Sequence, residues 1–445
     1  MFQIDDEFTA DNCRHHTPAM LQSRQHLAAR PNQPMPTQAH TIPLCLPSDI
    51  TAEQFLAEYW QKKPLLIKNG LPQLVGMFEP DDIIALAQDD NATARLISQQ
   101  DSQWQLQTSP LSDEAWQNLP AHWTVLVQNL EQWSPKLASL WQAFAFVPQW
   151  QRDDIMVSYA PTGGGVGGHY DNYDVFLAQG YGKRRWRLGK ICDANSEFLP
   201  NQPLRVLRDM GQIIFDEVLS AGDVLYVPSN LAHDGVAVDD CLTFSFGCRR
   251  PSVLTVLDAM ADVATHDDAL AIPLKIVQPP HPNAHRAVGM VAPESLADVK
   301  RQLLALLQSS QGDALLNRAM METVSKRQYD LLLPELDDDL TDLDALAQVL
   351  ADGAGVRQDL AGRMVYQRTT HDTNASNLDF ALFINGEYIA PDDIAPHAQV
   401  LLRRLADGEC LTGTDFEAAG VPIDELADWL ENGWVWLDID TETDF

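Results

Sequence analysis

The region between about residues 150 and 250 alternates short apolar runs with polar turns. The runs stand between clusters of Gly, Pro and Asp and read DDIMVSYAP, YDVFLAQG, RRWRLGK, QIIFDEVL, GDVLYVPS and CLTFSFGCR. Several short strands at this spacing predict an antiparallel sandwich or barrel. Because no helical pattern separates the runs, the region disfavours a doubly wound nucleotide-binding fold.

Helical patterns lie on both sides of this region. SDITAEQFLAEYW predicts a helix that begins at a Ser48 or Thr51 cap, and PESLADVKRQLLALLQ has apolar residues at three- and four-residue steps. We expect helical structure from about 265 to 370. After about 375, FALFINGEYIAP predicts a hairpin, and DELADWLENGWVWLD predicts a helix, a turn and a final strand. This last module has the size of a winged helix.

These patterns divide the chain into four segments. Residues 1–40 mix Gln, His, Pro and Thr without apolar periodicity, which is typical of a disordered extension. We expect a β-barrel domain over 41–262, a helical domain over 263–372 and a winged-helix-like domain over 373–445. The expected fold class is therefore α+β.

Charge narrows the range of partners. The 445 residues include 30 Lys and Arg against 63 Asp and Glu, for a net charge of −33. Residues 373–445 alone have sixteen acidic and two basic residues. Such a surface repels phosphate, so we expect no direct contact with nucleic acid, even by the winged helix, and a basic protein as partner. The alternative is that the acidity only confers solubility.

Two further features bear on the compartment. The sequence has no run of about 18 apolar residues and no apolar segment typical of a signal peptide, so we expect a cytoplasmic protein without a membrane partner. Its six cysteines form no C-x-x-C pair, which indicates neither a zinc knuckle nor a disulfide framework.

The stretch GGGVGGHYDNYDVF, residues 163 to 176, is the first candidate for chemistry. A phosphate-binding loop needs its glycines to lead into a helix, but these lead into His169, Tyr170, Asp171 and a strand. His169 and Asp171 are two residues apart, so in a strand both point to one face. The context therefore favours a metal site over a phosphate site.

A third ligand candidate, His233, ends the run AGDVLYVPSNLAH of the same region. Two imidazoles and one carboxylate leave half of an octahedron open, which suits non-haem Fe(II) in an oxygenase. A lone H-x-D or a lone His is more often structural. The spacing of Gly222, Asp223, Pro228 and His233, however, resembles the second motif of the cupin barrels.

An oxygenase that uses 2-oxoglutarate also needs a cation for the far carboxylate of this cosubstrate. In KRRWRLGK, Arg184 shares a face with Trp186 and Leu188 and points inward, whereas Arg185 and Arg187 point outward. Arg184 is the candidate clamp. By the same alternation Ser245 in LTFSFG could add a hydroxyl, although a strand serine is usually structural.

The motifs PTGGGVGGHYDNYDVF, GYGKRRWRLG, SAGDVLYVPSNLAHDG and FSFGCRRP, in this order and spacing, resemble the JmjC-domain ribosomal oxygenases over residues 45 to 445. They are most similar to the bacterial members that 3-hydroxylate an arginine of ribosomal large-subunit protein sixteen. The resemblance implies a JmjC double-stranded β-helix domain, a helical dimerisation domain and a C-terminal winged helix. One departure is Gly168, where a proline is expected.

The resemblance implies Fe(II) at His169, Asp171 and His233, 2-oxoglutarate at Arg184, dioxygen as cosubstrate, a basic ribosomal protein as substrate and a homodimer. Asp174 or Tyr170 could receive the substrate guanidinium. Two alternatives remain open: a related oxygenase acting on histidine or methyl-lysine of another basic protein, and a non-enzymatic metal-binding cupin. The buried cation favours an oxygenase over the cupin.

Overall fold

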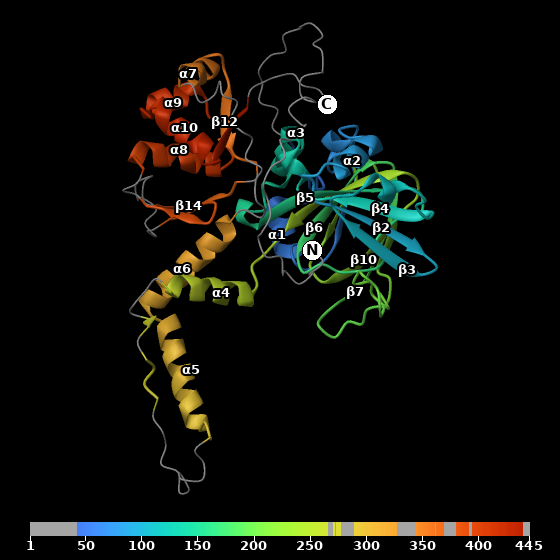
Figure 1. The fold of residues 1–445 in the computed structure, drawn as a ribbon, viewed down its shortest axis with the longest axis horizontal. Coiled ribbons are helices and arrows are strands. Elements are labelled where there is room, and N and C mark those ends of the chain that lie inside the picture. The colour runs from blue at the N-terminus through green and yellow to red at the C-terminus, as the bar shows by residue number, and fades with distance from the viewer. Residues whose placement is uncertain are drawn as a thin grey trace. The chain divides into compact units, whose positions relative to one another are not determined.

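The computed structural model describes residues 42–265, 270–271, 273–276, 289–326, 343–360, 362–368, 380–390 and 394–438 (Figure 1). They form two units, one of residues 42–148 and 152–249 and one of residues 149–151 and 250–438. The extension over 1–40, predicted to be disordered, lies outside the described residues. The predicted division at 262 and 372 stays a prediction.

The first unit is built on two antiparallel sheets. The larger has the strand order β1-β9-β6-β11-β5-β4-β2-β3, and the smaller has the order β10-β7-β8. The strands are β1 (Leu65–Ile67), β2 (Ala94–Gln100), β3 (Gln103–Thr108), β4 (His122–Val127), β5 (Arg152–Ala160), β6 (Asp174–Tyr181), β7 (Lys183–Ile191), β8 (Phe215–Ser220), β9 (Val224–Val227), β10 (Leu231–Ala237) and β11 (Cys241–Cys248). The expected sandwich or barrel of short antiparallel strands is confirmed.

Strand alternation builds two apolar layers on the larger sheet. On β6, Val175 and Leu177 point between the sheets and pack against Trp186 and Leu188 of β7. Phe176 points to the other face, where a large aromatic cluster includes Phe55, Phe144, Phe146 and Tyr226. Because both faces are covered, every residue of β6 except the last is buried.

Three α-helices belong to this unit: α1 (Ala52–Glu58), α2 (Pro80–Ala87) and α3 (Pro135–Ser139). Helix α1 begins after the predicted Thr51 cap, whose Oγ1 accepts a hydrogen bond from Gln54 N at 3.2 Å. Gln54 Oε1 in turn accepts from Thr51 N at 2.9 Å, completing a capping box. Phe55, the buried residue of α1, joins the aromatic cluster.

The second unit contains α4 (Val253–Ala264), α5 (Pro293–Leu307), α6 (Ser310–Ser325), α7 (Leu343–Ala351), α8 (Pro396–Ala406), α9 (Gly413–Ala419) and α10 (Ile423–Glu431). Its strands are β12 (Gly355–Gln358), β13 (Met364–Arg368), β14 (Phe380–Ile384), β15 (Glu387–Ile389) and β16 (Val435–Asp438). Helix α5 coincides with the predicted apolar repeat. The β14–β15 hairpin and the α10–β16 succession also agree with the prediction.

One expectation for this unit needs correction. Residues 265–370 are not helical throughout, because β12 pairs with β16 and β13 pairs with β14. Both early strands are four or five residues long, too short for a period of two to stand out in the sequence. Strand β13, which precedes residue 373, thus shares a sheet with β14, which follows it. None of the helices in the described part has the length and apolar character that a membrane crossing requires.

Candidate metal centre

The predicted ligands His169 and Asp171 lie on the metal loop (residues 163–171), which runs antiparallel to β10. The His169 and His233 backbones exchange two hydrogen bonds, of 2.9 and 2.8 Å, so the two residues are directly opposed. The same ladder joins Gly164 to Ala237 at 2.9 Å, and Asn230 N donates to Asp171 O at 2.7 Å. Sheet geometry therefore sets the separation of the two imidazoles.

Glycines are needed where this ladder turns or meets a large ring. Gly167 has a φ of +80°, and a Cβ there would lie 2.8 Å from the Trp104 ring. A Cβ at Gly235 would lie 2.6 Å from the Trp186 ring. The glycine-rich run thus lets the backbone turn and pack closely before it delivers two side chains to one point.

The three candidate ligand groups converge. Asp171 Oδ2 lies 3.9 Å from His169 Nε2 and 3.4 Å from His233 Nε2, and the ligand atoms of all three residues lie within 4.8 Å of one another. Among the described residues, these three form the group of His, Cys, Asp or Glu side chains that could hold a metal ion. Adjacent ligands of one transition-metal ion, each about 2.1 Å from it, are about 3 Å apart, so the set fits such an ion.

Hydrogen bonds to the backbone aim both imidazoles. His169 Nδ1 lies 2.9 Å from Gly167 O, and His233 Nδ1 lies 2.9 Å from Leu231 O. Because a carbonyl only accepts, Nδ1 carries a proton in each ring, and Nε2 is the atom left to bind a metal.

Burial and mutual charge set the protonation of the cluster. Burial, helped by the nearby His233, lowers the pKa of His169 to about 4. Burial also opposes charge on Asp171 and His233, but their hydrogen bond and mutual attraction outweigh it, so the pKa of Asp171 is lowered and that of His233 is raised. At neutral pH His169 is a neutral imidazole and Asp171 a carboxylate, whereas His233, which pairs with Asp171, must give up any proton on Nε2 when a metal binds.

The predicted clamp, Arg184, points into the same interior. It is 4% exposed, and its Nη1 donates to Ser158 Oγ of β5 at 3.1 Å. In the described residues Nε and Nη2 of this guanidinium have no hydrogen-bond partner. Its Cζ lies 5.9 Å from the Trp186 ring, which lies 6.0 Å from the His233 ring. A buried guanidinium with two free donors fits the carboxylate of a bound anion.

Known families match both units. Residues 139–256 match the JmjC domain family, and residues 302–435 match the ROXA-like winged helix. A probable ribosomal oxygenase of Haemophilus influenzae is 43% identical over 422 residues, covering 90% of this chain and all of that relative. The chain belongs to the JmjC-domain ribosomal oxygenases. This confirms the resemblance, the α+β JmjC and winged-helix fold and the 2-oxoglutarate-dependent dioxygenase class.

Other similar proteins come from Escherichia coli. The ribosomal protein uL16 3-hydroxylase of Escherichia coli is 36% identical over 209 residues, covering 47% of this chain and 55% of that enzyme. The solved structure of YcfD, a ribosomal oxygenase from E. coli, in complex with cobalt and 2-oxoglutarate has a TM-score of 0.68 and 27% identity, over 88% of this chain and 99% of that one. YcfD has also been solved with cobalt and succinic acid, at a TM-score of 0.68 and 26% identity.

The hydroxyl beside the clamp differs from the one expected. Ser158, which the sequence analysis missed, bonds to Arg184. Ser245 lies opposite Met156 in the β5–β11 register and is partly exposed on the same inner face. Its predicted contact with 2-oxoglutarate stays a prediction. A serine in a strand carries no distinctive signal, so only the strand pairing could have found Ser158.

The two residues expected to receive a substrate guanidinium are engaged within the oxygenase. Asp174 is fully buried and accepts a hydrogen bond of 2.7 Å from Tyr226, so a substrate cannot reach it from solvent. Tyr170 stacks on Phe198, and Arg205 Nη2 lies 3.4 Å from its hydroxyl. The expectation for Asp174 is therefore wrong, and Tyr170 already contacts an internal arginine.

Asp154 is a better candidate for this role. It shares the inner face of β5 with Met156 and Ser158, since Ile155 and Val157 belong to the opposite, aromatic layer. Both Asp154 and the ligand Asp171 act electrostatically on Tyr173, whose pKa is raised well above its usual value chiefly by burial. Its place on the same face of β5 as Ser158, which bonds to Arg184, puts Asp154 on the strand face that also holds the candidate clamp.

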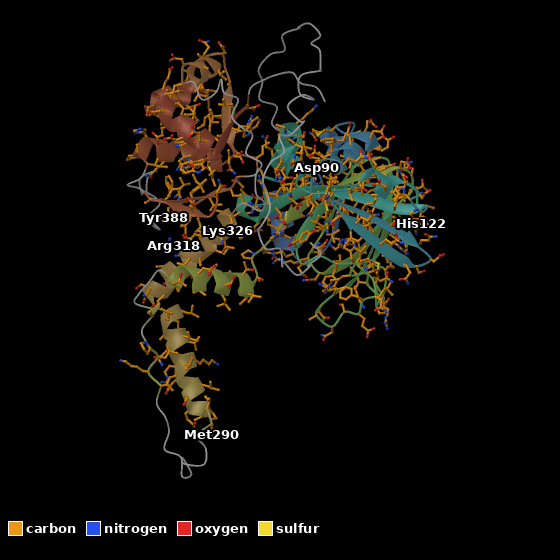
Figure 2. The ribbon with its side chains drawn as sticks, viewed as in Figure 1. Asp90, His122, Met290, Arg318, Lys326 and Tyr388 are labelled. Carbon is orange, nitrogen blue, oxygen red and sulfur yellow. The ribbon has the colours of Figure 1, made fainter. Side chains whose placement is uncertain are left out.

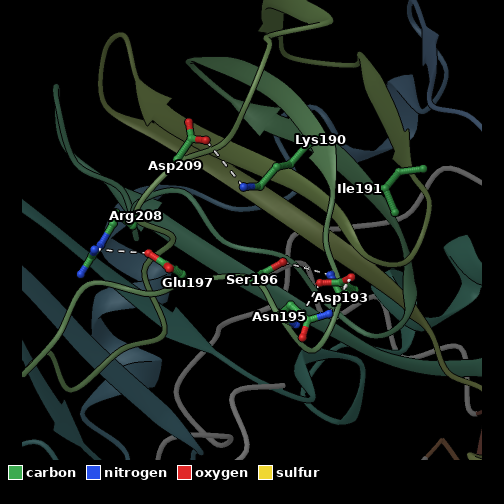
Figure 3. Close-up of a pocket in the computed structure, with 8 residues that line it drawn as sticks. All are labelled: Lys190, Ile191, Asp193, Asn195, Ser196, Glu197, Arg208 and Asp209. Carbon is green, nitrogen blue, oxygen red and sulfur yellow. Dashed lines mark hydrogen bonds and ion pairs between the residues drawn. The ribbon is translucent and has the colours of Figure 1, made fainter.

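A separate surface hollow of about 360 Å³ contains none of these residues (Figure 3). Lys190 lies 3.6 Å from Asp209, and Arg208 lies 3.2 Å from Glu197, so its charges are paired locally. It is lined by Lys190, Ile191, Asp193, Asn195, Ser196, Glu197, Arg208 and Asp209. The candidate chemistry therefore lies at the metal cluster.

Proposed function

We propose that this oxygenase binds Fe(II) at His169, Asp171 and His233 and 2-oxoglutarate at Arg184, and hydroxylates an arginine side chain of a basic large-subunit ribosomal protein. The observation that carries the proposal is the buried guanidinium of Arg184, which keeps two donors free beside Trp186. A structural metal site has no need of such an anion clamp. The similarity to a uL16 3-hydroxylase supports the substrate class.

The chain's own residues position the reactants. Together Fe(II), 2-oxoglutarate and dioxygen supply the oxidising chemistry, which yields succinate, carbon dioxide and a hydroxylated C–H bond. Arg184 fixes one end of the cosubstrate, and Ser158 holds Nη1 so that Nε and Nη2 remain to bind a carboxylate. The apolar layer around Val175, Leu177 and Leu225 excludes water from the cavity wall.

Asp154 supplies the contact for the substrate. A carboxylate forms two parallel hydrogen bonds with a guanidinium, and Asp154 lies on the inner face with its side chain partly exposed. Gly247 lies beside it, and because a Cβ at this position would crowd Asp154 Oδ1 at 3.3 Å, the glycine leaves space next to the carboxylate. Burial raises the pKa of Tyr173 well above its usual range, so this side chain stays a neutral phenol.

The charge of the whole chain suits a cationic partner. A net charge of −33 attracts a basic ribosomal protein at long range and repels nucleic acid. An encounter with such a protein before or during ribosome assembly requires the enzyme in the cytoplasm. The acidic winged helix contributes to this field and takes no part in binding nucleic acid.

The oxygenase also functions as a homodimer in this proposal. Helix α4 exposes Val253 to 79% and Leu254 to 76%, and several leucines of α5 are exposed as well. Met290, labelled in Figure 2, is 48% exposed shortly before α5. Apolar side chains gathered on two helices are better covered by a second copy than left in water.

The direct test is to incubate the purified enzyme with ribosomal proteins, Fe(II) and 2-oxoglutarate and to locate added oxygen by fragmentation mass spectrometry. We expect one oxygen on an arginine, together with release of succinate. The His233→Ala variant should lose both, and the matched His397→Ala variant, which changes an exposed histidine of α8, should lose neither. Oxygen on histidine, loss of a lysine methyl group or no change in any ribosomal protein would contradict the arginine assignment.

A further inference from the structure

Two methionines flank the metal loop from opposite sides. Met156 is on the inner face of β5, and Met210 lies in the connection between β7 and β8. Both side chains are partly exposed. They form a matched pair in which one thioether faces the interior that holds the candidate cosubstrate site and the other does not.

Several contacts place Met156 in that interior. It lies between Asp154 and Ser158 along β5, and Ser158 bonds to the clamp Arg184. Arg95 Nη2 lies 3.8 Å from Met156 Sδ, and Arg95 interacts electrostatically with the ligand Asp171. Met156 also packs against the cluster of Trp104 and Val206. These two side chains are the nearest neighbours of Gly167 on the metal loop.

Met210 packs on the outside of the same loop. Its Sδ lies 2.7 Å from the point that a Cβ would occupy on Gly168. Its neighbours include Tyr170, Phe198 and Leu207. Gly168 and Tyr170 alternate with the candidate ligands His169 and Asp171, so this cluster lies on the side of the loop opposite to those ligands. The thioether of Met210 thus fills the space that a proline at 168 would need.

We infer that Met156 is a site of intramolecular oxidation when the oxygenase turns over without a protein substrate. This inference rests on the proposed function. 2-Oxoglutarate is oxidatively decarboxylated, so that one atom of dioxygen enters the new carboxylate of succinate. The other atom forms an S–O bond at Met156, whose sulfur is oxidised by two electrons to the sulfoxide. No proton is released from the thioether, and the carboxyl group that 2-oxoglutarate loses leaves as carbon dioxide.

Arg95 favours this product. A sulfoxide oxygen is a strong acceptor, and the Arg95 guanidinium is already 3.8 Å from the sulfur. The oxidised side chain is larger and polar, and it lies next to Asp154, the candidate contact for the substrate. Oxidation of Met156 therefore lowers the affinity for the protein substrate and limits further turnover.

The test uses the full-length enzyme with Fe(II), 2-oxoglutarate and ¹⁸O₂, with catalase present and ribosomal proteins absent. We expect ¹⁸O on Met156 in proportion to the succinate released, and no label on Met210. The Met156→Leu variant, which conserves side-chain volume, should still release succinate but carry no label at this position. Treatment of the unlabelled enzyme with hydrogen peroxide is the control, and it should oxidise Met210.

Succinate release without label on Met156 would overturn the inference and leave the proposed function standing. Equal labelling of Met156 and Met210 would also overturn it, because a diffusible oxidant would then be responsible. Absence of succinate even with ribosomal proteins added would overturn both the inference and the proposed function.

Discussion

Arg184 and Arg185 are adjacent in the sequence but lie in different environments. Arg184 is buried with two free donors, whereas Arg185 is exposed and forms two hydrogen bonds of 2.6 Å with Asp216 on β8. Strand alternation alone separates them. The pair therefore offers a test in which neighbouring substitutions of the same residue type have different outcomes.

We expect Arg184→Ala to raise the dissociation constant for 2-oxoglutarate about ten- to hundredfold, since a charge-assisted hydrogen bond contributes roughly 1.5–3 kcal/mol. Arg185→Ala should change it less than about twofold. Titration calorimetry with a redox-inert metal such as Mn²⁺ under anaerobic conditions measures both. Equal losses in the two variants would show that Arg184 does not hold the cosubstrate.

The pKa of Asp154 leads us to expect that kcat/KM for the protein substrate depends on pH. Burial, with a smaller contribution from the neighbouring charge of Asp153, raises its pKa to about 6. Below pH 6 the carboxyl is neutral and cannot pair with a guanidinium, so kcat/KM for the protein substrate should rise as the pH increases from about 5 to 7. His169, whose pKa is lowered to about 4, stays neutral across this range.

The Asp154→Asn variant should lose this rise and about ten- to hundredfold of kcat/KM at pH 7.5. Because the folded-state pKa of Asp154 lies above its unfolded value, ionisation destabilises the fold progressively above about pH 4. The variant should therefore melt at a higher temperature than the wild type at pH 7.5. An unchanged pH profile would rule out Asp154 as the substrate contact.

The residues differ in how far the sequence could predict them. His169 and Asp171 stand two apart, His233 has a recognisable spacing to Gly222, and Arg184 follows from alternation, so all four could be proposed from local patterns. Ser158, Asp154 and Met156 could not, because their roles depend on which face of β5 turns inward. The burial of Asp174 has a different cause, since nothing in its local sequence shows that Tyr226 covers it.

At the scale of elements, the metal loop and β10 act as one unit although 64 positions separate His169 from His233. Their ladder continues from Gly164 and Ala237 to Asp171 and Asn230. The short strands and their turns were predictable from alternation and Gly or Asp punctuation. The pairing order was not, because neighbours such as β6 and β11 are far apart in the chain.

The exposed apolar residues of helix α4 lead us to expect that an introduced acidic residue weakens the proposed dimer. Leu254 is 76% exposed on this helix, and Thr255 beside it is exposed but polar. If α4 lies in a dimer interface, Leu254→Glu should bury a carboxylate there and raise the dimer dissociation constant at least tenfold, whereas Thr255→Glu should have a smaller effect. Light scattering after size-exclusion chromatography measures the mass. A wild-type monomer at micromolar concentration would refute the dimer.

At the scale of the whole molecule, charge predicts a salt dependence. Exposed charges are screened within about 8–10 Å at physiological ionic strength, whereas Arg184, the proposed cosubstrate clamp, is buried. Raising NaCl from 50 to 300 mM (on the order of a halving of the screening length) should therefore lower kcat/KM for the ribosomal protein severalfold. The dissociation constant for 2-oxoglutarate should change far less. Equal sensitivity of both would indicate that the net charge plays no part in substrate capture.

The backbone bonds between His169 and His233 have a consequence for the choice of ion. Two of the three proposed ligands are held in place before any metal arrives, so the chain sets their spacing but has little means to prefer iron over other divalent ions of similar size. Nitrogen and oxygen ligands bind Co²⁺, Ni²⁺ and Zn²⁺ more tightly than Fe²⁺. These ions should therefore displace iron and silence the enzyme, so we expect its activity to depend on the metals supplied to it.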